Sequence, residues 1–290
     1  VHVRNSPLSN YLIQIGDNHR RSYRRLSKEK GNNVLNLKNL LKEVGNESTL
    51  LAVKFGKNFD FNQKEYAYLI ESGSVLATGE KGSKVGLLPT HTLEGYDPIG
   101  FAEAIVARPT GLRFKQKADV ILRQFNSSDL RRAVAGANVF SQTIIKYSIG
   151  RILGQARRSA TFSFEDEFIN KNYKLLTRRV VEQGEAVITI GSASTAMFFI
   201  ETGAVRVVSQ GKKLLASLED GECFGESALF DAKPRSAGVI ASKKTTLLVI
   251  NREQVQVEIN KESSMVRLIV LLLIKRLEVM NILRLREQGK

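Results

Sequence analysis

The chain alternates between two kinds of hydrophobic pattern. Short apolar runs, separated by Gly, Asn, Asp and Lys, predict β-strands in two stretches, about 49–125 and about 178–250. After each stretch, apolar residues recur with helical spacing: from Asn126, a predicted N-cap, to about residue 158, and over about 252–288. The predicted order is therefore strands, helix, strands, helix. The runs that predict strands are residues 49–55, 65–72, 118–125, 178–183, 186–190, 196–208, 212–218 and 245–250.

The second half of this pattern repeats the first in sequence. Residues 98–111, "PIGFAEAIVARPTG", align without gaps to residues 223–236, "CFGESALFDAKPRS", at an offset of 125. Residues 69–75, "LIESGSV", align to residues 199–205, "FIETGAV", at an offset of 130, so the first copy has five more residues between the blocks. Matching blocks in the same order indicate an internal repeat. We therefore expect two copies of one small β-rich domain, each closed by a helical tail.

The repeat divides the 290 residues into three expected parts, and this length suits two domains. Residues 1–33 are a basic N-terminal arm, 34–160 the first copy, and 161–290 the second copy with its C-terminal helix. Within the arm, "HRRSYRRLSKEK" (19–30) predicts a solvated, mobile segment. Its "RRLS", Arg24–Ser27, also matches a basic-directed kinase site.

Composition narrows the class of protein. An apolar content of 42% excludes a disordered chain, and a net charge of +15 favours an anionic partner or surface, although diffuse charge can serve solubility alone. The single cysteine, Cys223, excludes an internal disulfide and suits a reducing compartment such as the cytoplasm. The longest unbroken apolar run, 268–274, is shorter than the about 20 residues that span a bilayer, so we expect no membrane span.

No catalytic constellation is visible in the sequence. The three histidines, His2, His19 and His91, are isolated, and no cluster has the spacing of metal ligands. We therefore expect a protein that is not an enzyme and holds no metal.

One segment combines groups that suit a sugar phosphate. In residues 221–241, Glu226 and Arg235 lie nine positions apart among small residues, which let a backbone approach a ligand closely. Arg235 offers a planar fork of donors to phosphate oxygens, and Glu226 can accept a hydrogen bond from a sugar hydroxyl. A helix that starts here would add donors for an anion. The plain alternative is a surface salt bridge beside a turn.

Residues 224–237, "FGESALFDAKPRSA", resemble the phosphate-binding cassette of the cyclic nucleotide-binding domain family. The family pattern is F-G-E-x-A-L, a short variable stretch and P-R-x-A, and every defined position is filled. The resemblance covers about 165–290 well and about 50–160 more weakly. It implies a mainly β fold with helices: two tandem cyclic nucleotide-binding-like β-rolls (double-stranded β-helices), each followed by helices.

The resemblance also implies roles for individual residues. Glu226 would bind the ribose 2′-hydroxyl, Arg235 the cyclic phosphate, and the neighbouring small residues would offer backbone donors. Ser236, which follows the arginine, favours cAMP, since Thr at this place accompanies cGMP in the family. Serine can also donate to guanine, so cGMP stays open as an alternative ligand. The implied ligand-binding residues are Phe224, Gly225, Glu226, Ser227, Ala228, Arg235, Ser236 and Ala237, with Val207 and Leu215 either lining the base pocket or serving as ordinary core residues.

The first copy departs from the family at the positions that bind the ligand. Phe101 stands where Glu226 stands in the second copy, and Thr110 stands at the position of Arg235. Phe101 would place an apolar ring where a polar sugar should sit. Nearby charged residues, Glu103, Arg108 and Arg113, could serve another ligand, but their spacing is not the family's. We expect a degenerate copy that supports assembly.

The C-terminal segment is apolar on most of its circumference, so its helix must be buried on more than one side. It could cover the pocket of its own domain, pair with a second chain or another protein partner, or simply pack onto the β-roll.

The expected function is a non-enzymatic, cytoplasmic cAMP sensor that binds one nucleotide in the second copy and signals through the C-terminal helix. One alternative is a nucleic-acid or anionic-surface binder with cyclic nucleotide as effector, but the basic residues are spread out and lack interleaved aromatics. Another is an inhibitor like a kinase regulatory subunit, with "RRLS" as its inhibitory segment. We do not expect a full activator of the bacterial type, whose winged helix-turn-helix would need roughly 70 more residues.

Overall fold

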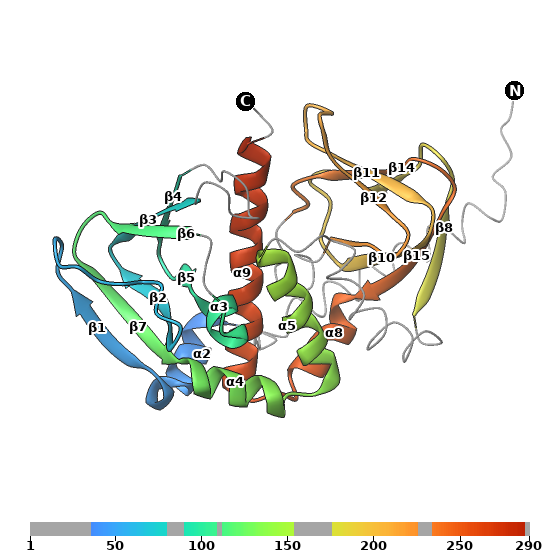
Figure 1. The fold of residues 1–290 in the computed structure, drawn as a ribbon. Coiled ribbons are helices and arrows are strands. Elements are labelled where there is room, and N and C mark those ends of the chain that lie inside the picture. The colour runs from blue at the N-terminus through green and yellow to red at the C-terminus, as the bar shows by residue number, and fades with distance from the viewer. Residues whose placement is uncertain (1–35, 80–89, 109–111, 154–175, 226–233, 288–290) are drawn as a thin grey trace, which may run out of the picture. The chain divides into compact units, whose positions relative to one another are not determined.

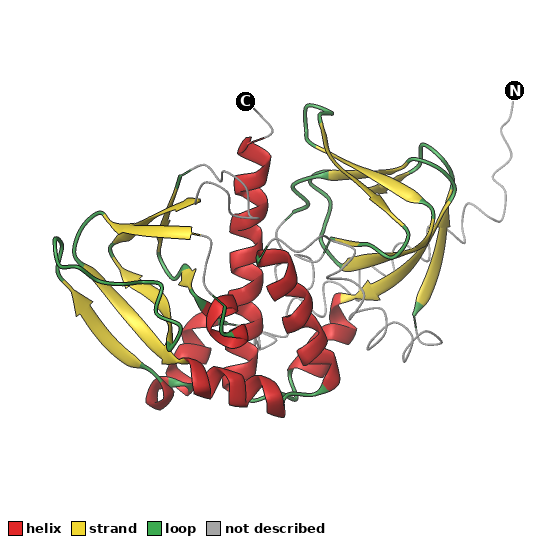
Figure 2. Cartoon of the chain, in the orientation of Figure 1, coloured by secondary structure: helices red, strands yellow, loops and turns green. Residues whose placement is uncertain are grey.

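The computed structural model describes residues 36–79, 90–108, 112–153, 176–225 and 234–287 (Figure 1). The strands fall into two sets, and helices follow each set in the chain (Figure 2). The expected fold class, mainly β with helices, is confirmed. Residues 37–290 form one compact unit.

The first set of strands forms two sheets that enclose an apolar core. Their orders are β1-β7-β2-β5 and β4-β3-β6. Core side chains from both sheets, among them Tyr68, Val75, Leu93 and Leu122, are almost fully buried. The elements of this copy are α2 (Leu37–Glu43), η1 (Gly45–Glu47), β1 (Thr49–Val53), β2 (Tyr66–Ser72), β3 (Ser74–Gly79), β4 (His91–Glu94), β5 (Pro98–Ile99), α3 (Phe101–Val106), β6 (Leu112–Gln116), β7 (Val120–Asn126), α4 (Ser127–Gly136) and α5 (Val139–Ile152).

The second set repeats this arrangement with one additional paired strand among the described residues. Its sheets have the orders β13-β10-β15-β8 and β12-β11-β14-β9. The core again joins both sheets, through residues such as Ile200, Val205, Leu218 and Leu247. The elements are β8 (Thr177–Val181), β9 (Ala186–Ile188), β10 (Ala196–Thr202), β11 (Ala204–Val208), β12 (Leu214–Glu219), β13 (Cys223–Phe224), β14 (Gly238–Ala241), β15 (Thr245–Asn251), α8 (Arg252–Ile259) and α9 (Ser264–Glu287).

The two copies share strand register as well as strand order. In β2 and β7, Tyr66 pairs with Asn126, and the register shifts between Ile70 and Ser72. In β10 and β15, Ala196 pairs with Asn251, and the register shifts between Ile200 and Thr202. Offsets of 130 on the first strand and 125 on the second carry one ladder onto the other. The offsets read from the sequence therefore describe equivalent positions in space.

Register also narrows the place of the five extra residues in the first copy. Ala77 pairs with His91, and the equivalent pair in the second copy is Val207 with Ala216. Because the offset is 130 up to Ala77 and 125 from His91 onward, the insertion lies between these two residues.

The helix expected to extend to about residue 158 is two helices within the described residues, so the prediction of one continuous helix is wrong. Asn126 caps α4 as predicted, and its Oδ1 accepts a hydrogen bond from the N–H of Ser128 at 2.8 Å. A second asparagine, Asn138, accepts from the N–H of Ser141 at 2.8 Å and begins α5. Residues beyond Leu153 lie outside the described part.

The C-terminal segment is likewise divided, where the sequence predicted one helix. Asn251 and Gln254 form a capping box that begins α8, and α8 ends at Ile259. Helix α9 then begins at Ser264. Residues 260–263 separate the two helices, so the direction of α9 is independent of that of α8.

The apolar side chains around helix α9 are buried because the helix packs against other elements on several sides, as predicted. Its most extensive contacts are with α5 and α2, followed by α4, α3 and β5, which all belong to the first copy. In Figure 1, α9 runs beside α3, α4 and α5. The apolar side chains buried on α9 are Met265, Val266, Leu268, Ile269, Val270, Leu272, Leu273, Ile274, Leu277 and Met280.

The corner between β10 and β11 gives a test of how the β-roll is held. Gly203 has φ of +116°, and a Cβ there would lie 2.5 Å from Cα of Thr245. At Gly184, φ is +84° and a Cβ would meet nothing within 4 Å. We expect Gly184→Ala to cost about 1–2 kcal/mol of unfolding free energy from its backbone conformation. Gly203→Ala should cost about 1–3 kcal/mol more because of the steric clash.

Urea unfolding of both variants, followed by circular dichroism, measures this difference. Equal losses in the two variants would show that the approach of Gly203 to Thr245 does not hold the corner.

Candidate functional site

The site predicted from the sequence lies where β13 ends and β14 begins. Phe224 ends β13, Gly225 follows it, and Arg235, Ser236 and Ala237 lead into β14. Arg235 is buried, Ala237 is half-buried and Ser236 is exposed. Glu226, Ser227 and Ala228 lie outside the described residues.

Arg235 connects the start of the cassette to the β-roll. Only 8% of the residue is exposed. Its Nη1 donates a hydrogen bond to the carbonyl oxygen of Gly225 at 3.1 Å, and its Nη2 donates to the carbonyl oxygen of Ala196 on β10. Its backbone is held too, because its N–H donates to Ser192 O at 3.0 Å and its carbonyl accepts from the N–H of Gly191 at 2.8 Å. These contacts orient the guanidinium at the start of the cassette.

Gly225 is required by the position of this guanidinium. Its φ is +77°, and a Cβ on it would lie 2.8 Å from Nη1 of Arg235. Gly100, the equivalent glycine of the first copy, has φ of +76°, and the atom nearest its Cβ would be Tyr66 O at 3.5 Å. The backbone is thus the same in both copies, but only the second copy uses the free space for an arginine.

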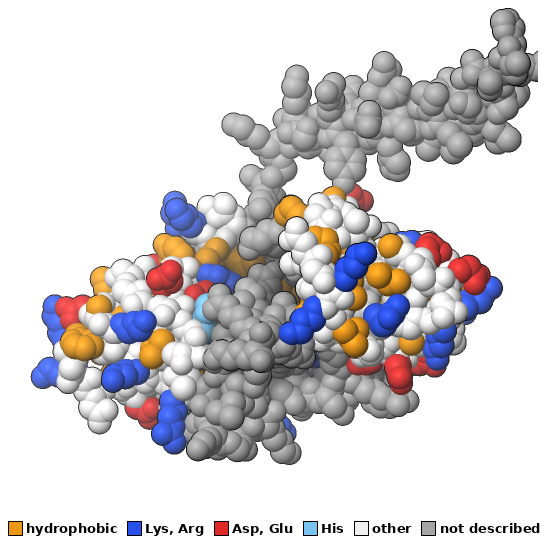
Figure 3. All heavy atoms as spheres, turned by 90° about the horizontal axis from the view of Figure 1, so that it is seen from above, with side chains coloured by type: hydrophobic (Ala, Val, Ile, Leu, Met, Phe, Trp, Pro, Cys, Tyr) orange, Lys and Arg blue, Asp and Glu red, His pale blue; other side chains and the backbone are white. Residues whose placement is uncertain are grey.

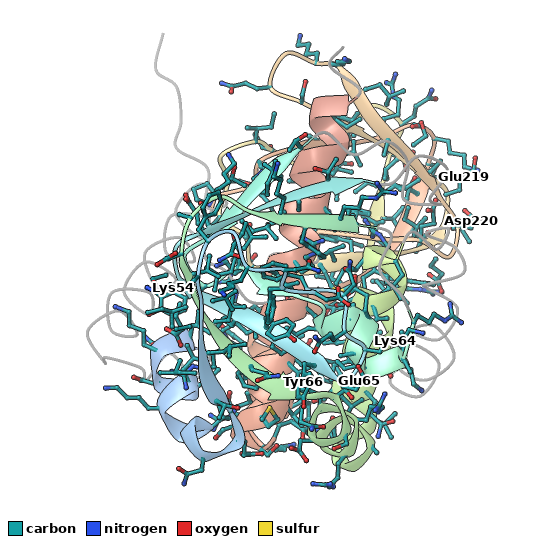
Figure 4. All side chains as sticks on the ribbon, turned by 60° about the vertical axis from the view of Figure 1, so that its left-hand side comes forward. Lys54, Lys64, Glu65, Tyr66, Glu219 and Asp220 are labelled. Carbon is teal, nitrogen blue, oxygen red and sulfur yellow. The ribbon has the colours of Figure 1, made fainter. Side chains whose placement is uncertain are left out.

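The start of the cassette is fixed by ring packing and by a turn. Phe224 stacks on Phe198 of β10, with ring centroids 5.2 Å apart and an interplanar angle of 19°. Before β13, Asp220 Oδ1 accepts a hydrogen bond from the N–H of Gly203 at 2.6 Å, and Glu222 Oε2 accepts from the N–H of Glu219 at 2.8 Å. Glu219 and Asp220 are labelled in Figure 4. These bonds set the direction in which the chain enters β13.

The two base-pocket candidates differ in their place in the sheet. Val207 pairs with Ala216 and Val239 and packs against the core of the second β-roll. Because Val207 pairs with Ala216 and Val208 with Leu214, Leu215 is the extra residue of a β-bulge. Ala216, which the sequence reasoning missed, shares the face of Val207. No feature of the sequence predicts this bulge, which places Ala216 instead of Leu215 opposite Val207.

In the first copy, the residue equivalent to Glu226 is part of a helix. Phe101 is the first residue of α3 and is 2% exposed, and its ring centroid lies 5.3 Å from that of Phe125. Phe125 alternates with Val120 and Leu122, which belong to the core of the roll, so it points to the other face of β7. The ring of Phe101 therefore packs outside the roll, where we had expected it to occupy the sugar position. Thr110 lies outside the described residues.

Aromatic rings occupy the interior of the first β-roll instead. Phe59, Phe61 and Tyr68 lie edge-on to one another at 4.8–6.4 Å, and Phe114 lies 6.1 Å from Phe61. Burial raises the pKa of Tyr68 to about 12, and its hydroxyl donates to Gln63 Oε1 at 3.4 Å. Figure 4 shows this copy with Lys54, Lys64, Glu65 and Tyr66 labelled.

No group of three or more His, Cys, Asp or Glu residues with metal-binding geometry occurs among the described residues. In the same part of the chain, no helix has both the length and the apolar character needed to cross a membrane. Cys223 is buried and forms no disulfide.

Comparisons with known proteins bear on the second copy. Residues 178–262 match the family model described as "Cyclic nucleotide-binding domain". Over 88 residues, 30% of the chain, the sequence is 39% identical to the cAMP-dependent protein kinase regulatory subunit of Yarrowia lipolytica, of which 24% is covered. Over 98 residues, 32% of the chain, it is 36% identical to a putative potassium channel protein of Rhodopseudomonas palustris, of which 23% is covered. The chain thus spans about a quarter of the length of these two relatives.

Among solved structures, the regulatory subunit of a cAMP-independent protein kinase A from Trypanosoma brucei is similar over 80% of this chain and 88% of that one. The identity is 18% and the TM-score 0.36. The residues that the family model matches, 178–262, lie within the second copy. The recognition made from residues 224–237 is confirmed.

The contact between Gly225 and Arg235 gives a test with a matched control. We expect Gly225→Ala to weaken cyclic nucleotide binding at least tenfold, because its Cβ would displace the Arg235 guanidinium, and loss of one charged hydrogen bond costs about 1.5–3 kcal/mol. Gly100→Ala imposes the same backbone strain in the first copy without touching an arginine, so it should leave binding unchanged. Fluorescent cAMP titration measures both variants, and equal affinities would contradict this role of Gly225.

Proposed function

We propose that this protein is a non-enzymatic cAMP sensor that binds one cyclic nucleotide in its second copy. The observation that carries the proposal is the buried guanidinium of Arg235, held against Gly225 O and Ala196 O within the family's cassette. A guanidinium offers paired N–H donors to an anion such as phosphate. A cyclic phosphate supplies such an anion, and its oxygens match the fork of the guanidinium.

The pre-set position of Arg235 supports tight binding of a small ligand. Its side chain is anchored before any ligand arrives, so less conformational entropy is lost on binding. The flanking β13 and β14 are each paired to neighbouring strands, which keeps the two ends of the cassette in place.

The sugar and base contacts complete the proposed site. Glu226 accepts the ribose 2′-hydroxyl, and Ser227, Ala228 and Ala237 offer backbone donors to the phosphate. The base lies against Val207, with Ala216 or Leu215 beside it. Ser236 favours cAMP over cGMP by the family pattern, and its exposure suits a residue that meets an entering ligand.

The first copy is proposed to bind no nucleotide. Phe101 replaces the hydroxyl acceptor and Thr110 replaces the phosphate ligand. Phe101 is committed to its contact with Phe125, and aromatic rings fill the interior of the roll. Neither Phe101 nor the interior rings could turn toward a sugar phosphate without losing these aromatic contacts.

Nucleic acid or an anionic surface is a less favoured partner. On the face drawn in Figure 3, Lys and Arg side chains are interspersed with Asp and Glu. Several basic residues of the described part are engaged in ion pairs, such as Lys54 with Asp119 at 2.9 Å and Lys244 with Glu182 at 2.8 Å. A diffuse arrangement of this kind does not concentrate charge along a groove.

A kinase-inhibiting role is the second candidate, and the similarity to a cAMP-dependent protein kinase regulatory subunit favours it. Its proposed inhibitory segment, Arg24–Ser27, lies outside the described residues. Binding of a kinase catalytic subunit, released by cAMP and weakened by a change in these residues, would support it. We place the protein in the cytoplasm, where a cysteine outside any disulfide, such as Cys223, stays reduced.

Calorimetry against cAMP and cGMP tests the proposal directly. We expect a stoichiometry near one per chain and tighter binding of cAMP. Arg235→Ala should weaken binding by about 2–5 kcal/mol, because a charged phosphate would lose its partner in a semi-buried site. Arg206→Ala is the matched control, since this arginine is exposed on β11, and it should bind like the unchanged protein.

Glu226→Ala should weaken binding less and remove the preference for cAMP over its 2′-deoxy analogue. A stoichiometry near two would mean that other residues have restored the first site. If Arg235→Ala and Arg206→Ala titrate alike, the cassette does not bind the nucleotide.

Nucleotide binding is proposed to change the packing or mobility of the C-terminal helices. Helix α8 follows directly from β15 and packs against β15 and α5, so it links the second β-roll to the first copy. A ligand shifts an equilibrium only by its different affinity for two states, so these helices must contact the ligand or cassette more in one state. We expect cAMP to change the amide hydrogen exchange of residues 262–286. Unchanged protection at saturating cAMP, in a chain shown to bind it, would make the helix static packing.

A further inference from the structure

Helix α9 follows the second copy in sequence but is buried among elements of the first. Its packing partners α2, α3, α4, α5 and β5 all precede residue 153. A helix that is apolar on most sides needs such a set of partners, because a single sheet face covers only one side. The first copy therefore supplies most of the surface that keeps α9 out of water.

The C-terminal half of α9 lies over the degenerate cassette. Met280 packs against Leu112 at the start of β6, and Val279 and Phe114 complete this cluster. At the offset of 125, Leu112 and Phe114 correspond to Ala237 and Val239, beside the phosphate position of the second copy. Helix α3, which also contacts α9, begins at the position of the cassette glutamate. Side chains of α9 thus lie where the second copy is arranged for its ligand.

The charge beneath this part of α9 is opposite to that of the second site. Lys275 Nζ lies 3.1 Å from Asp97 Oδ1 and donates to Gly95 O at 3.0 Å. Arg276 is 6% exposed, and burial lowers its pKa, while the charges of Glu103 and Asp97 oppose that shift. The second copy presents an arginine to an anion, whereas the first presents two carboxylates to cations.

The N-terminal half of α9 is held in the same way. Arg267 Nη2 lies 2.9 Å from Glu43 Oε2 on α2, and the hydroxyl of Ser264 donates to the same oxygen. Just before α9, Glu262 Oε1 accepts a hydrogen bond from the N–H of Asn138 at 2.9 Å, where α5 begins. Ion pairs from two basic residues, Arg267 and Lys275, therefore hold α9 to the first copy.

We propose that the first copy is a helix-binding domain and that its ligand is α9 of the same chain. The copy has exchanged a small anionic ligand for a basic, apolar helix. Asp97 and Glu103 recognise Lys275 and Arg276, Glu43 recognises Arg267, and the surface formed by Leu112 and Phe114 receives Val279 and Met280. This assignment gives a binding role to the copy that lacks the nucleotide cassette, and it does not depend on nucleotide binding by the other copy.

Site-directed crosslinking of the full chain tests whether α9 of the same chain lies on the surface formed by Leu112 and Phe114. In a Cys223→Ser background, Leu112→Cys combined with Met280→Cys should react with a short bis-maleimide to give a crosslinked monomer, identified by peptide mass spectrometry. The matched control pair is Ala237→Cys with Met280→Cys, because residue 237 is the equivalent of residue 112 in the second copy. This control should crosslink much less.

Three outcomes distinguish the possibilities. A crosslink between 112 and 280 within one chain supports the proposal. Preferential crosslinking of 237 to 280 would overturn it, because α9 would then cover its own domain. A covalent dimer joined through 112 and 280 would also overturn it, since the occupant would be the helix of a second chain.

A charge variant provides a second measurement that leaves the apolar contacts intact. Lys275→Glu places a third negative charge beside Asp97 and Glu103, so hydrogen exchange of residues 264–280 should accelerate several-fold. Lys244→Glu removes the exposed ion pair with Glu182 in the second copy and should leave this exchange unchanged. Equal exchange in the two variants would contradict recognition by charge. Both experiments use nucleotide-free protein, so their failure is separate from failure of the proposed nucleotide site.

Discussion

The close approach of backbone at the corner between β10 and β11 is the constraint on which both the roll and its site depend. At this corner the chain leaves one sheet and enters the other, and Gly203 lies against Thr245 where no side chain fits. The hydroxyl of Thr245 in turn bonds to both the N–H and the carbonyl of Ala204. With the corner closed, β10 and β11 are fixed in their separate sheets, and these sheets carry β13 and β14, the two ends of the cassette. The position of Arg235 is therefore a consequence of how the roll closes.

The same framework has been given opposite chemistry in its two copies. Strand register, the bulge in the central pair and the left-handed glycine before the cassette are repeated. Side chains on that framework differ: a buried arginine in the second copy, and carboxylates with aromatic filling in the first. Under the two proposals, backbone geometry sets where a ligand lies, while the charge of a few side chains decides whether that ligand is an anion or a basic helix.

Helix α9 connects the two copies of the β-roll. It is covalently attached to the copy that carries Arg235 and is packed on the copy that carries Asp97 and Glu103. If the position of α8 depends on the cassette, the affinity of the first copy for α9 and that of the second copy for nucleotide are coupled, and such coupling is reciprocal. Its size depends on how strongly α9 is held, and two ion pairs at the edges of an apolar interface make that strength sensitive to single charges.

The sequence by itself determined the features that depend on local or repeated patterns. Alternating apolar residues specified most of the longer strands, Asn126 specified the start of α4, and the two offsets specified which residues are equivalent. The cassette could be recognised from the sequence because its glycine, proline and arginine have a fixed spacing. Only the tertiary structure decided the rest. The break at Asn138, the bulge at Leu215 and the outward packing of Phe101 each depend on neighbours distant in the chain. The surface that buries α9 is the clearest case. The hydrophobic effect favours burial of the apolar residues of α9 but is not directional, so only the folded structure decides which surface buries them.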